Sequence, residues 1–213
     1  MSASSLAPLA AFDVDHTLTR RDCVLPFMRL VAGTPQVAVT LVRRAPQLVG
    51  VALGQIDRDV AKASLVHDLF AGRPLSRMLT LGQQHALDTF ANWMRPDTLA
   101  RLRWHQEQGH TTALVSASLG PYLHPLGRLL GVNHVLCTEL ESDDANGKLT
   151  GRFLGVNCRG PEKVARLVAV AGRPNEVWAY GDSAGDREML AWADYGTLVR
   201  KGTSISSDPG TPF

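Results

Sequence analysis

The stretch Leu9-Ala-Ala-Phe-Asp-Val-Asp-His-Thr17 decides the fold, because a short apolar run stops at two aspartates. Residues 9–12 are all apolar, which is typical of a strand buried on both faces of a parallel sheet. Asp13 and Asp15 stand two residues apart just beyond this run, so both side chains can reach one cavity. The stretch therefore predicts a buried strand that ends in an acidic site.

Three later segments share this profile of an apolar run followed by polar or small residues. They are Thr111 to Val115, His134 to Cys137, and Glu176 to Tyr180. Between them, helices opened by Pro or Asp and closed by Gly are predicted at Asp97 to Gly109, Pro121 to Gly131 and Pro161 to Gly172. This alternation predicts an α/β fold with a Rossmann-like parallel sheet, whose functional groups gather beyond the carboxyl ends of the strands.

The first connection is too long for a simple βαβ unit. About 100 residues separate Asp13 from Ser116, whereas such a unit takes on the order of 30. The intervening sequence is helical in pattern, so we expect a cap of three or four helices at residues 20–95, inserted into a core of residues 1–19 and 96–200. The alternative is a helical half without a role at the site.

Two smaller features lie in the second half of the chain. Asn146-Gly147 is a strong turn dipeptide and predicts a hairpin over residues 140–153 that only decorates the core. Residues 201–213 are rich in Gly, Ser, Thr and Pro and are expected to form a flexible tail.

Composition excludes several classes of protein. The 22 basic and 20 acidic residues give a net charge of +2 without a long basic run, so no nucleic-acid partner is expected. Three distant cysteines give no disulfide framework, and a cytoplasmic location is expected. The uncharged stretches fall short of the roughly 18 to 20 residues that a membrane span needs, so no span is predicted. Oligomeric state cannot be read from the sequence.

The two aspartates fit different chemical roles. An ionised carboxylate at Asp13 is a nucleophile without the help of a base, and its phosphorylated product can be opened by water. Asp15 would protonate the departing oxygen and later activate water. A calcium loop is excluded, because the positions that require Gly and Glu hold Leu18 and Val24.

Four further candidate site residues follow along the chain, each next to a predicted strand or helix. Ser116 follows the next predicted strand, Lys163 lies at a helix start, and Asp182 and Asp186 follow a later strand. Four converging aspartates repel one another and a phosphate dianion, so the site needs a hard cation with oxygen ligands, for which Mg²⁺ is the natural choice. Lys163 adds positive charge, and the hydroxyls of Thr17 and Ser116 can bind phosphate oxygens. Taken singly, such a serine is more often a helix cap and such a lysine is more often solvated.

These motifs together resemble the haloacid dehalogenase superfamily, and specifically its phosphoserine-phosphatase-like branch, subfamily IB, whose inserted cap is of the C1 type. The resemblance runs from about Leu9 to Val199. The four motifs that carry it are Phe-Asp13-Val-Asp15-His-Thr17, Leu-Val-Ser116-Ala117-Ser118, Lys163 with the residues before it, and Tyr-Gly-Asp182-Ser-Ala-Gly-Asp186.

The resemblance implies a phosphatase that uses Mg²⁺ and an aspartyl-phosphate. Asp13 would be the nucleophile and a metal ligand, and Asp15 the acid and base, with its backbone carbonyl on the metal. Asp182 and Asp186 would complete the metal site, and Ser116, Ala117 and Lys163 would contact the phosphate. Asp22 occupies the place of an acidic residue that meets the substrate amino group in phosphoserine phosphatases; equally, it can cap a helix of the cap domain.

Departures from the family pattern put phosphoserine itself in doubt. Ala117, Ser118 and Gly185 replace residues usual in phosphoserine phosphatases, and His16 replaces a smaller residue, which we interpret as an adaptation to unusual loop backbone. Among the basic residues of the predicted cap, Arg58 and Lys62 lie one helical turn apart and are candidates to bind a second anionic group of the substrate.

The function predicted from the sequence is hydrolysis of a small phosphorylated metabolite, with phosphoserine or a related ester as the substrate. One alternative is a receiver-type signalling domain, which also phosphorylates an aspartate; the large insertion and the late acidic motif disfavour it. Another is a non-catalytic binding or regulatory protein on the same fold, which the intact acidic motifs disfavour.

Overall fold

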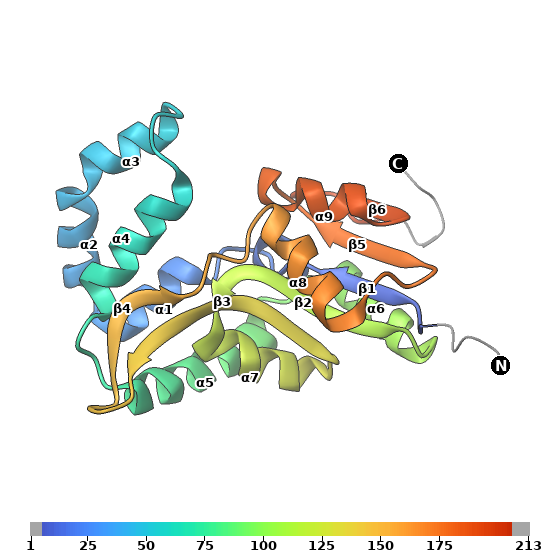
Figure 1. The fold of residues 1–213 in the computed structure, drawn as a ribbon, viewed down its shortest axis with the longest axis horizontal. Helices are drawn as coiled ribbons and strands as arrows, with labels where there is room; N and C mark the ends of the chain where they lie inside the picture. The colour runs from blue at the N-terminus through green and yellow to red at the C-terminus, as the bar shows by residue number, and fades with distance from the viewer. Residues whose placement is uncertain (1–5, 206–213) are drawn as a thin grey trace.

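The computed structural model describes residues 6–205, which contain one six-stranded sheet of order β4-β3-β2-β1-β5-β6 (Figure 1). Neighbouring strands are parallel, except that β3 and β4 are antiparallel. This arrangement confirms the predicted α/β fold. The strands are β1 (Leu9–Phe12), β2 (Thr111–Leu119), β3 (His134–Asp143), β4 (Lys148–Leu154), β5 (Val177–Gly181) and β6 (Tyr195–Leu198).

The central strand β1 shows why the sheet is covered on both faces. Its four side chains are fully buried and alternate between two apolar clusters. Ala10 and Phe12 belong to the larger cluster, which includes residues of α6 and α7, whereas Leu9 and Ala11 belong to a second cluster with residues of α8 and α9. A strand of this kind has no polar face, which explains the unbroken apolar run in its sequence.

The helices between the strands follow the sequence prediction closely. Each of the three predicted core helices begins and ends within two residues of its expected bounds, and a short helix near the carboxyl end adds a fourth. The helices are α6 (Pro96–Glu107), α7 (Gly120–Leu130), α8 (Pro161–Ala171) and α9 (Arg187–Trp192), and two short helical turns are η1 (Val14–Leu18) and η2 (Ala184–Asp186).

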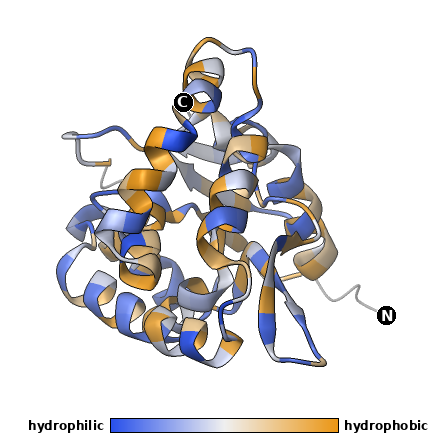
Figure 2. Ribbon diagram, turned by 90° about the vertical axis from the view of Figure 1, so that its left-hand side faces the viewer, coloured by the Kyte–Doolittle hydropathy of each residue, from blue (hydrophilic) through white to orange (hydrophobic). Residues whose placement is uncertain are grey.

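The insertion between β1 and β2 contains five helices before α6, rather than three or four. In Figure 1, α2, α3 and α4 stand at one end of the molecule, whereas α5 runs beside α7. Figure 2 shows hydrophobic segments alternating with hydrophilic ones along the helices on this side. The five helices are α1 (Val24–Ala32), α2 (Thr34–Arg43), α3 (Ala45–Ala52), α4 (Arg58–Phe70) and α5 (Leu75–Asn92).

The predicted hairpin is confirmed as β3 and β4, but it does more than decorate the core. Strand β4 packs against α4, and Leu149 exchanges backbone hydrogen bonds with Gly72 (2.8 Å) and Arg73 (2.9 Å) in the loop that follows α4. The hairpin therefore supports the inserted helices. This role could not be predicted from the sequence, because β4 and the loop after α4 lie far apart along the chain.

The described end of the chain is tied to the start of α6. Arg95 donates hydrogen bonds to the carbonyls of Arg200 (3.2 Å) and Thr203 (2.8 Å), and Ile205 donates its N–H to Asp97 (3.1 Å). The rest of the predicted tail, residues 206–213, lies outside the described residues. Among the described helices, none alone has the length and hydropathy of a membrane span; α1 and α2 reach them only as a pair bent by 115°.

Candidate active site

The chain turns sharply just after β1. Asp13 still donates its N–H to the carbonyl of Tyr180 on β5 (2.9 Å), and η1 then reverses the chain. Within this turn His16 has a φ of +61°. No other non-glycine residue between 6 and 205 has a positive φ. This confirms that His16 occupies unusual loop backbone, and it aims Asp13 and Asp15 beyond the end of the sheet.

Three aspartates meet at the carboxyl ends of β1 and β5. Asp13, Asp182 and Asp186 each offer a carboxylate oxygen within 4.8 Å of the others. Lys163 reaches between two of them from the first turn of α8, and its Nζ donates to Asp13 Oδ1 (2.6 Å) and Asp186 Oδ1 (2.5 Å). The three aspartates follow the ends of parallel strands and Lys163 lies at a helix start, as the sequence predicts.

Burial shifts the protonation of this cluster. Burial raises the pKa of Asp13 to about 7, although Lys163 pulls it down. The pKa of Asp182 is raised to about 6, mainly by burial and then by Asp13. Burial alone would lower the pKa of Lys163, but Asp13 and Asp186 together raise it, so this lysine stays charged. A cation among these carboxylates would favour their ionised forms.

The loop after β5 is built around Asp186. Its Oδ2 accepts hydrogen bonds from the N–H groups of Asp182 (3.2 Å) and Ser183 (3.0 Å) and from the Ser183 hydroxyl (2.8 Å). A Cβ at Gly181 would lie 2.5 Å from the Cβ of Asp186, so the close approach of this loop requires glycine there. Asp186 thus holds the loop through one oxygen and faces Lys163 with the other.

Asp15 is held by a separate set of donors. Its Oδ1 accepts the N–H of Cys23 (2.7 Å), and its Oδ2 accepts the hydroxyl of Ser118 (2.6 Å), which in turn accepts the hydroxyl of Tyr122 (2.8 Å). Burial and then the charge of Asp22 raise the pKa of Asp15, whereas these hydrogen bonds lower it. A carboxyl group that is half-buried and firmly oriented suits proton transfer.

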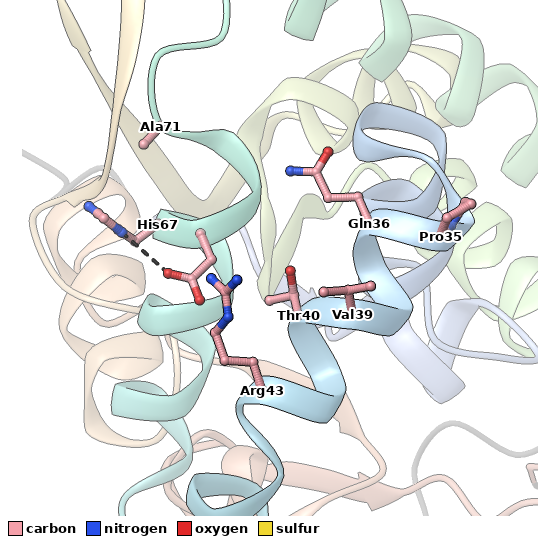
Figure 3. Close-up of a pocket in the computed structure, with 8 residues that line it drawn as sticks. Pro35, Gln36, Val39, Thr40, Arg43, His67 and Ala71 are labelled. Atoms are coloured by element: carbon pink, nitrogen blue, oxygen red, sulfur yellow. Dashed lines mark ion pairs between the residues drawn. The ribbon is translucent and has the colours of Figure 1, made fainter.

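A cavity of about 660 Å³ joins this acidic cluster to the inserted helices. Asp13, Asp15, Lys163, Asp182 and Asp186 all line it. A separate hollow between α2 and α4, shown in Figure 3, is lined by cap residues such as Arg43 and His67 and by none of the predicted site residues. The acidic cavity is therefore the candidate active site.

The predicted phosphate contacts are placed unequally. Ala117 lines the cavity, whereas Thr17 and Ser116 do not. Ser116 is 1% exposed and its hydroxyl accepts the N–H of Ser118 (3.2 Å), while the hydroxyl of Thr17 is buried and, among the described residues, has no hydrogen-bond partner. Phosphate binding by these two hydroxyls stays a prediction.

The three predicted substrate residues of the insertion all line the cavity. Lys62 reaches the core, where Nζ donates to the carbonyl of Ala117 and to Asn157 Oδ1 (2.7 Å). Arg58 lies one turn earlier on α4 and is exposed. Asp22 accepts the N–H of Leu25 at the start of α1 (2.9 Å), so its predicted capping role is present at the edge of the cavity.

Sequence reasoning missed the residues that join the insertion to the core. Asn157 Nδ2 donates to Asp59 on α4 (2.8 Å), and Asn157 Oδ1 also accepts the Thr138 hydroxyl (2.7 Å). Ser118 was noted only as a departure from the family pattern, yet it contacts Asp15 directly. Asn157 carried one signal, since it lies six residues before Lys163 in a polar segment.

The residues present fit a hard divalent cation. Asp13, Asp182 and Asp186 supply only carboxylate oxygens, and no histidine or cysteine belongs to this group. Oxygen ligands and a high negative charge are what Mg²⁺ prefers in proteins. The donor set therefore agrees with the predicted cofactor.

Comparison with known proteins now decides the family. Residues 10–191 match the model of the haloacid dehalogenase-like hydrolases. The chain belongs to the haloacid dehalogenase-like hydrolase family. Within this family, it is 34% identical over 187 residues to Protein CicA of Caulobacter vibrioides, covering 87% of this chain and 83% of that protein.

Two other relatives of this hydrolase place it more closely. It is 29% identical over 193 residues to a phosphoserine phosphatase of Archaeoglobus fulgidus, which covers 88% of this chain but 51% of that protein. A crystal structure of a Bordetella pertussis protein of unknown function superimposes with a TM-score of 0.75 at 25% identity, covering 90% and 89% of the two chains. The predicted resemblance to the phosphoserine-phosphatase-like branch is confirmed.

Proposed function

We propose that this hydrolase is a Mg²⁺-dependent phosphatase that cleaves a phosphate monoester through an aspartyl-phosphate on Asp13. The observation that carries the proposal is the convergence of four aspartates and Lys163 on one cavity. We infer further that it acts in the cytoplasm on a small phosphorylated molecule, for which phosphoserine is one candidate.

The roles of the side chains follow from their surroundings. Asp13 attacks phosphorus, and its ion pair with Lys163 (2.6 Å) keeps the carboxylate charged and oriented. As the bond from phosphorus to the ester oxygen breaks, Asp15 gives its proton to that oxygen. Asp15 then takes a proton from a water molecule that attacks the aspartyl-phosphate, which releases phosphate and restores both carboxyl groups.

The remaining charges serve the phosphoryl group. Mg²⁺ would be held by Asp13, the backbone carbonyl of Asp15, Asp182 and Asp186, and would neutralise charge on the phosphoryl oxygens. Lys163 contributes a fixed positive charge from within the protein. Ser116 and Ala117 lie in the second half of the neighbouring strand β2. We propose that these two residues contact the phosphate oxygens.

The test is hydrolysis of p-nitrophenyl phosphate with Mg²⁺, with EDTA and with Asp13→Asn. We expect turnover that EDTA abolishes and that the variant lowers by at least a thousandfold. Asp88→Asn, on the exposed surface of α5, is the matched control and should keep full activity. Acid-quenched protein should carry phosphate on Asp13.

Two outcomes would contradict the proposal. Phosphate trapped on another residue would refute the role of Asp13. Absence of turnover in the folded, Mg²⁺-loaded protein against a broad set of phosphate esters would favour a binding protein, and a phosphoaspartate that persists for hours would favour a signalling domain.

A further inference from the structure

The walls of the active-site cavity differ in chemistry. The wall made by the core carries the aspartates, Lys163, Asn157 and Arg159. The wall made by the inserted helices is largely apolar. Its main side chains come from all four helices α1 to α4, namely Leu25, Met28, Leu41, Leu48, Val51 and Leu65.

These apolar side chains are not closed off by their own packing. Met28 is 3% exposed, but the other five are only half-buried. Leu48 and Val51 lie on α3, which stands with α2 and α4 at one end of the molecule in Figure 1. A ligand that covers these half-buried apolar groups removes their surface from water, which makes the free energy of binding more favourable.

The polar groups on this wall are few, and most are already engaged. Lys62 is bound to Ala117 and Asn157, and Asp59 accepts the Asn157 amide. Asp22 caps α1 through its contact with Leu25. A charged amino-acid leaving group would find Asp22 and the exposed Arg58, but it would also have to desolvate against six apolar side chains, which is costly.

We propose that the leaving alcohol of the substrate carries an extended apolar chain, which lies against the inserted helices while the phosphate meets Asp13. The substrate class is thus an alkyl or acyl-chain phosphate monoester. A cavity of about 660 Å³ leaves ample room beyond the phosphate, because pockets of roughly 300–1,000 Å³ hold ligands of drug size. This inference rests on the proposed function for its catalytic part only.

The first experiment measures kcat/KM for ethyl, butyl, hexyl and octyl phosphate below their micelle concentrations, beside phosphoserine. Burying one methylene contributes ~0.8 kcal/mol, or about fourfold in affinity. We expect kcat/KM to rise two- to fourfold per methylene up to the longer chains, mainly through KM. A flat series, or a preference for phosphoserine, overturns the inference and leaves the proposed function intact.

Variants on the two sides of α3 locate the effect. Leu48→Gln places a polar group in the cavity and should flatten the dependence on chain length. Val49→Gln is the matched control, because Val49 is 56% exposed and does not line the cavity, so this variant should keep the wild-type slope. Equal slopes in the two variants, with unchanged circular dichroism, would contradict the assignment.

A binding measurement separates this inference from the proposed function. Titration calorimetry can use butyl and octyl phosphonate, in which a C–P bond replaces the ester linkage and resists hydrolysis. Binding should be tighter, and the heat-capacity change more negative, for the longer chain. If these hold while no ester is hydrolysed, the phosphatase proposal fails and the apolar site stands. If binding is independent of chain length, the apolar site fails whatever the activity.

Discussion

Asp15 has both carboxylate oxygens occupied by donors, one from the backbone of Cys23 and one from Ser118. A general acid needs a fixed direction as well as a suitable pKa, and short hydrogen bonds to a charged oxygen provide this direction. Tyr122 extends the chain by donating to Ser118, so the orientation of Asp15 depends on a fully buried phenol. Ser118 is thus a positioning residue for the proposed proton transfer.

We predict that Ser118→Ala lowers kcat by about tenfold, which corresponds to ~1.4 kcal/mol. Because the hydroxyl stabilises ionised Asp15, its loss raises the pKa of Asp15, and the limb of the pH profile that requires protonated Asp15 should move to higher pH. Tyr122→Phe removes the hydrogen bond to Ser118 but keeps the one from Ser118 to Asp15, so it should move this limb less. A decrease in kcat without any change in the pH profile would indicate a structural role alone.

Protons and the proposed cation would compete for the acidic cluster of Asp13, Asp182 and Asp186. In the apo protein burial raises the pKa of Asp13 to about 7 and that of Asp182 to about 6. Binding of Mg²⁺ requires the ionised carboxylates, so affinity should be constant well above pH 7 and should fall as the pH drops through 7 and 6.

We predict that the apparent Kd for Mg²⁺, measured by calorimetry, increases by at least tenfold between pH 8 and pH 5.5. Asp182→Asn should weaken binding at pH 8 and reduce the dependence on pH, because one titrating ligand is removed. Affinity that is independent of pH would show that the cation binds elsewhere. Asp88→Asn again provides the control.

At the scale of elements, one amide takes part in two of the contacts between α4 and the core. Asn157 accepts a hydrogen bond from Lys62 and donates one to Asp59, so two side chains of α4 bind the same amide. Lys62 also donates to the carbonyl of Ala117. The segment that carries Asn157 also leads into α8 and Lys163. The position of the inserted helices is thereby linked to the start of α8, which carries Lys163.

We predict that Asn157→Ala raises KM about fivefold or more, because α4 loses two of its hydrogen bonds to the core and the cavity is less well defined. Hydrogen exchange in residues 58–70 should speed up. Gln47→Ala, which removes the contact to Ser64 between α3 and α4 but touches no core residue, is the matched control. Unchanged exchange in α4 would show that other contacts hold the helix.

The sequence sufficed for elements whose pattern is local. The run Leu9–Phe12 was predicted with its observed bounds, and the helix at Pro161 ends beside its terminal glycine. Strand β6 was missed, because Tyr195–Leu198 is short, contains Gly196, and depends on pairing with β5. Strand β2 was predicted too short, since it continues past Ser116 through an irregular pairing with β3.

The candidate site was predictable to the extent that strand ends determine it. Asp13 and Asp182 directly follow strands and Lys163 lies in the first turn of a helix, so topology alone brings them together. The contact of Asn157 with Asp59 depends on how the insertion folds back over the core, and that of Ser118 with Asp15 depends on the pairing of β2 with β1. Each contact links residues about a hundred positions apart. No local pattern encodes such contacts.

At the scale of the whole molecule, an aromatic group lies behind the active site. Phe12 and Tyr180 stack with ring centroids 4.4 Å apart, directly before Asp13 and Gly181 in the chain. His105 on α6 joins them, with Nε2 2.9 Å from the Tyr180 hydroxyl and Nδ1 2.9 Å from His110. This packing holds the ends of β1 and β5 at a fixed spacing.

His105 should make the stability of the protein sensitive to acid. Burial, and then the nearby His110 and Arg101, lower its pKa to about 3, whereas an unfolded histidine titrates near 6.5. The unfolded state therefore binds the proton first. The contribution of neutral His105 is fully present above about pH 6.5 and is lost as the pH falls toward 3, by up to ~1.4 kcal/mol per pH unit.

We predict that His105→Gln is less stable than the wild type at pH 7.5, because the ring contacts with Phe12 and Tyr180 are lost, but loses less stability on acidification. Urea unfolding midpoints from pH 7.5 to 4.5 measure this slope, with His67→Gln, an exposed position on α4, as the control. Parallel slopes in all three proteins would contradict the prediction. A shallower slope in His105→Gln alone would show that the packing behind Asp13 and Gly181, rather than an exposed histidine, makes folding sensitive to acid.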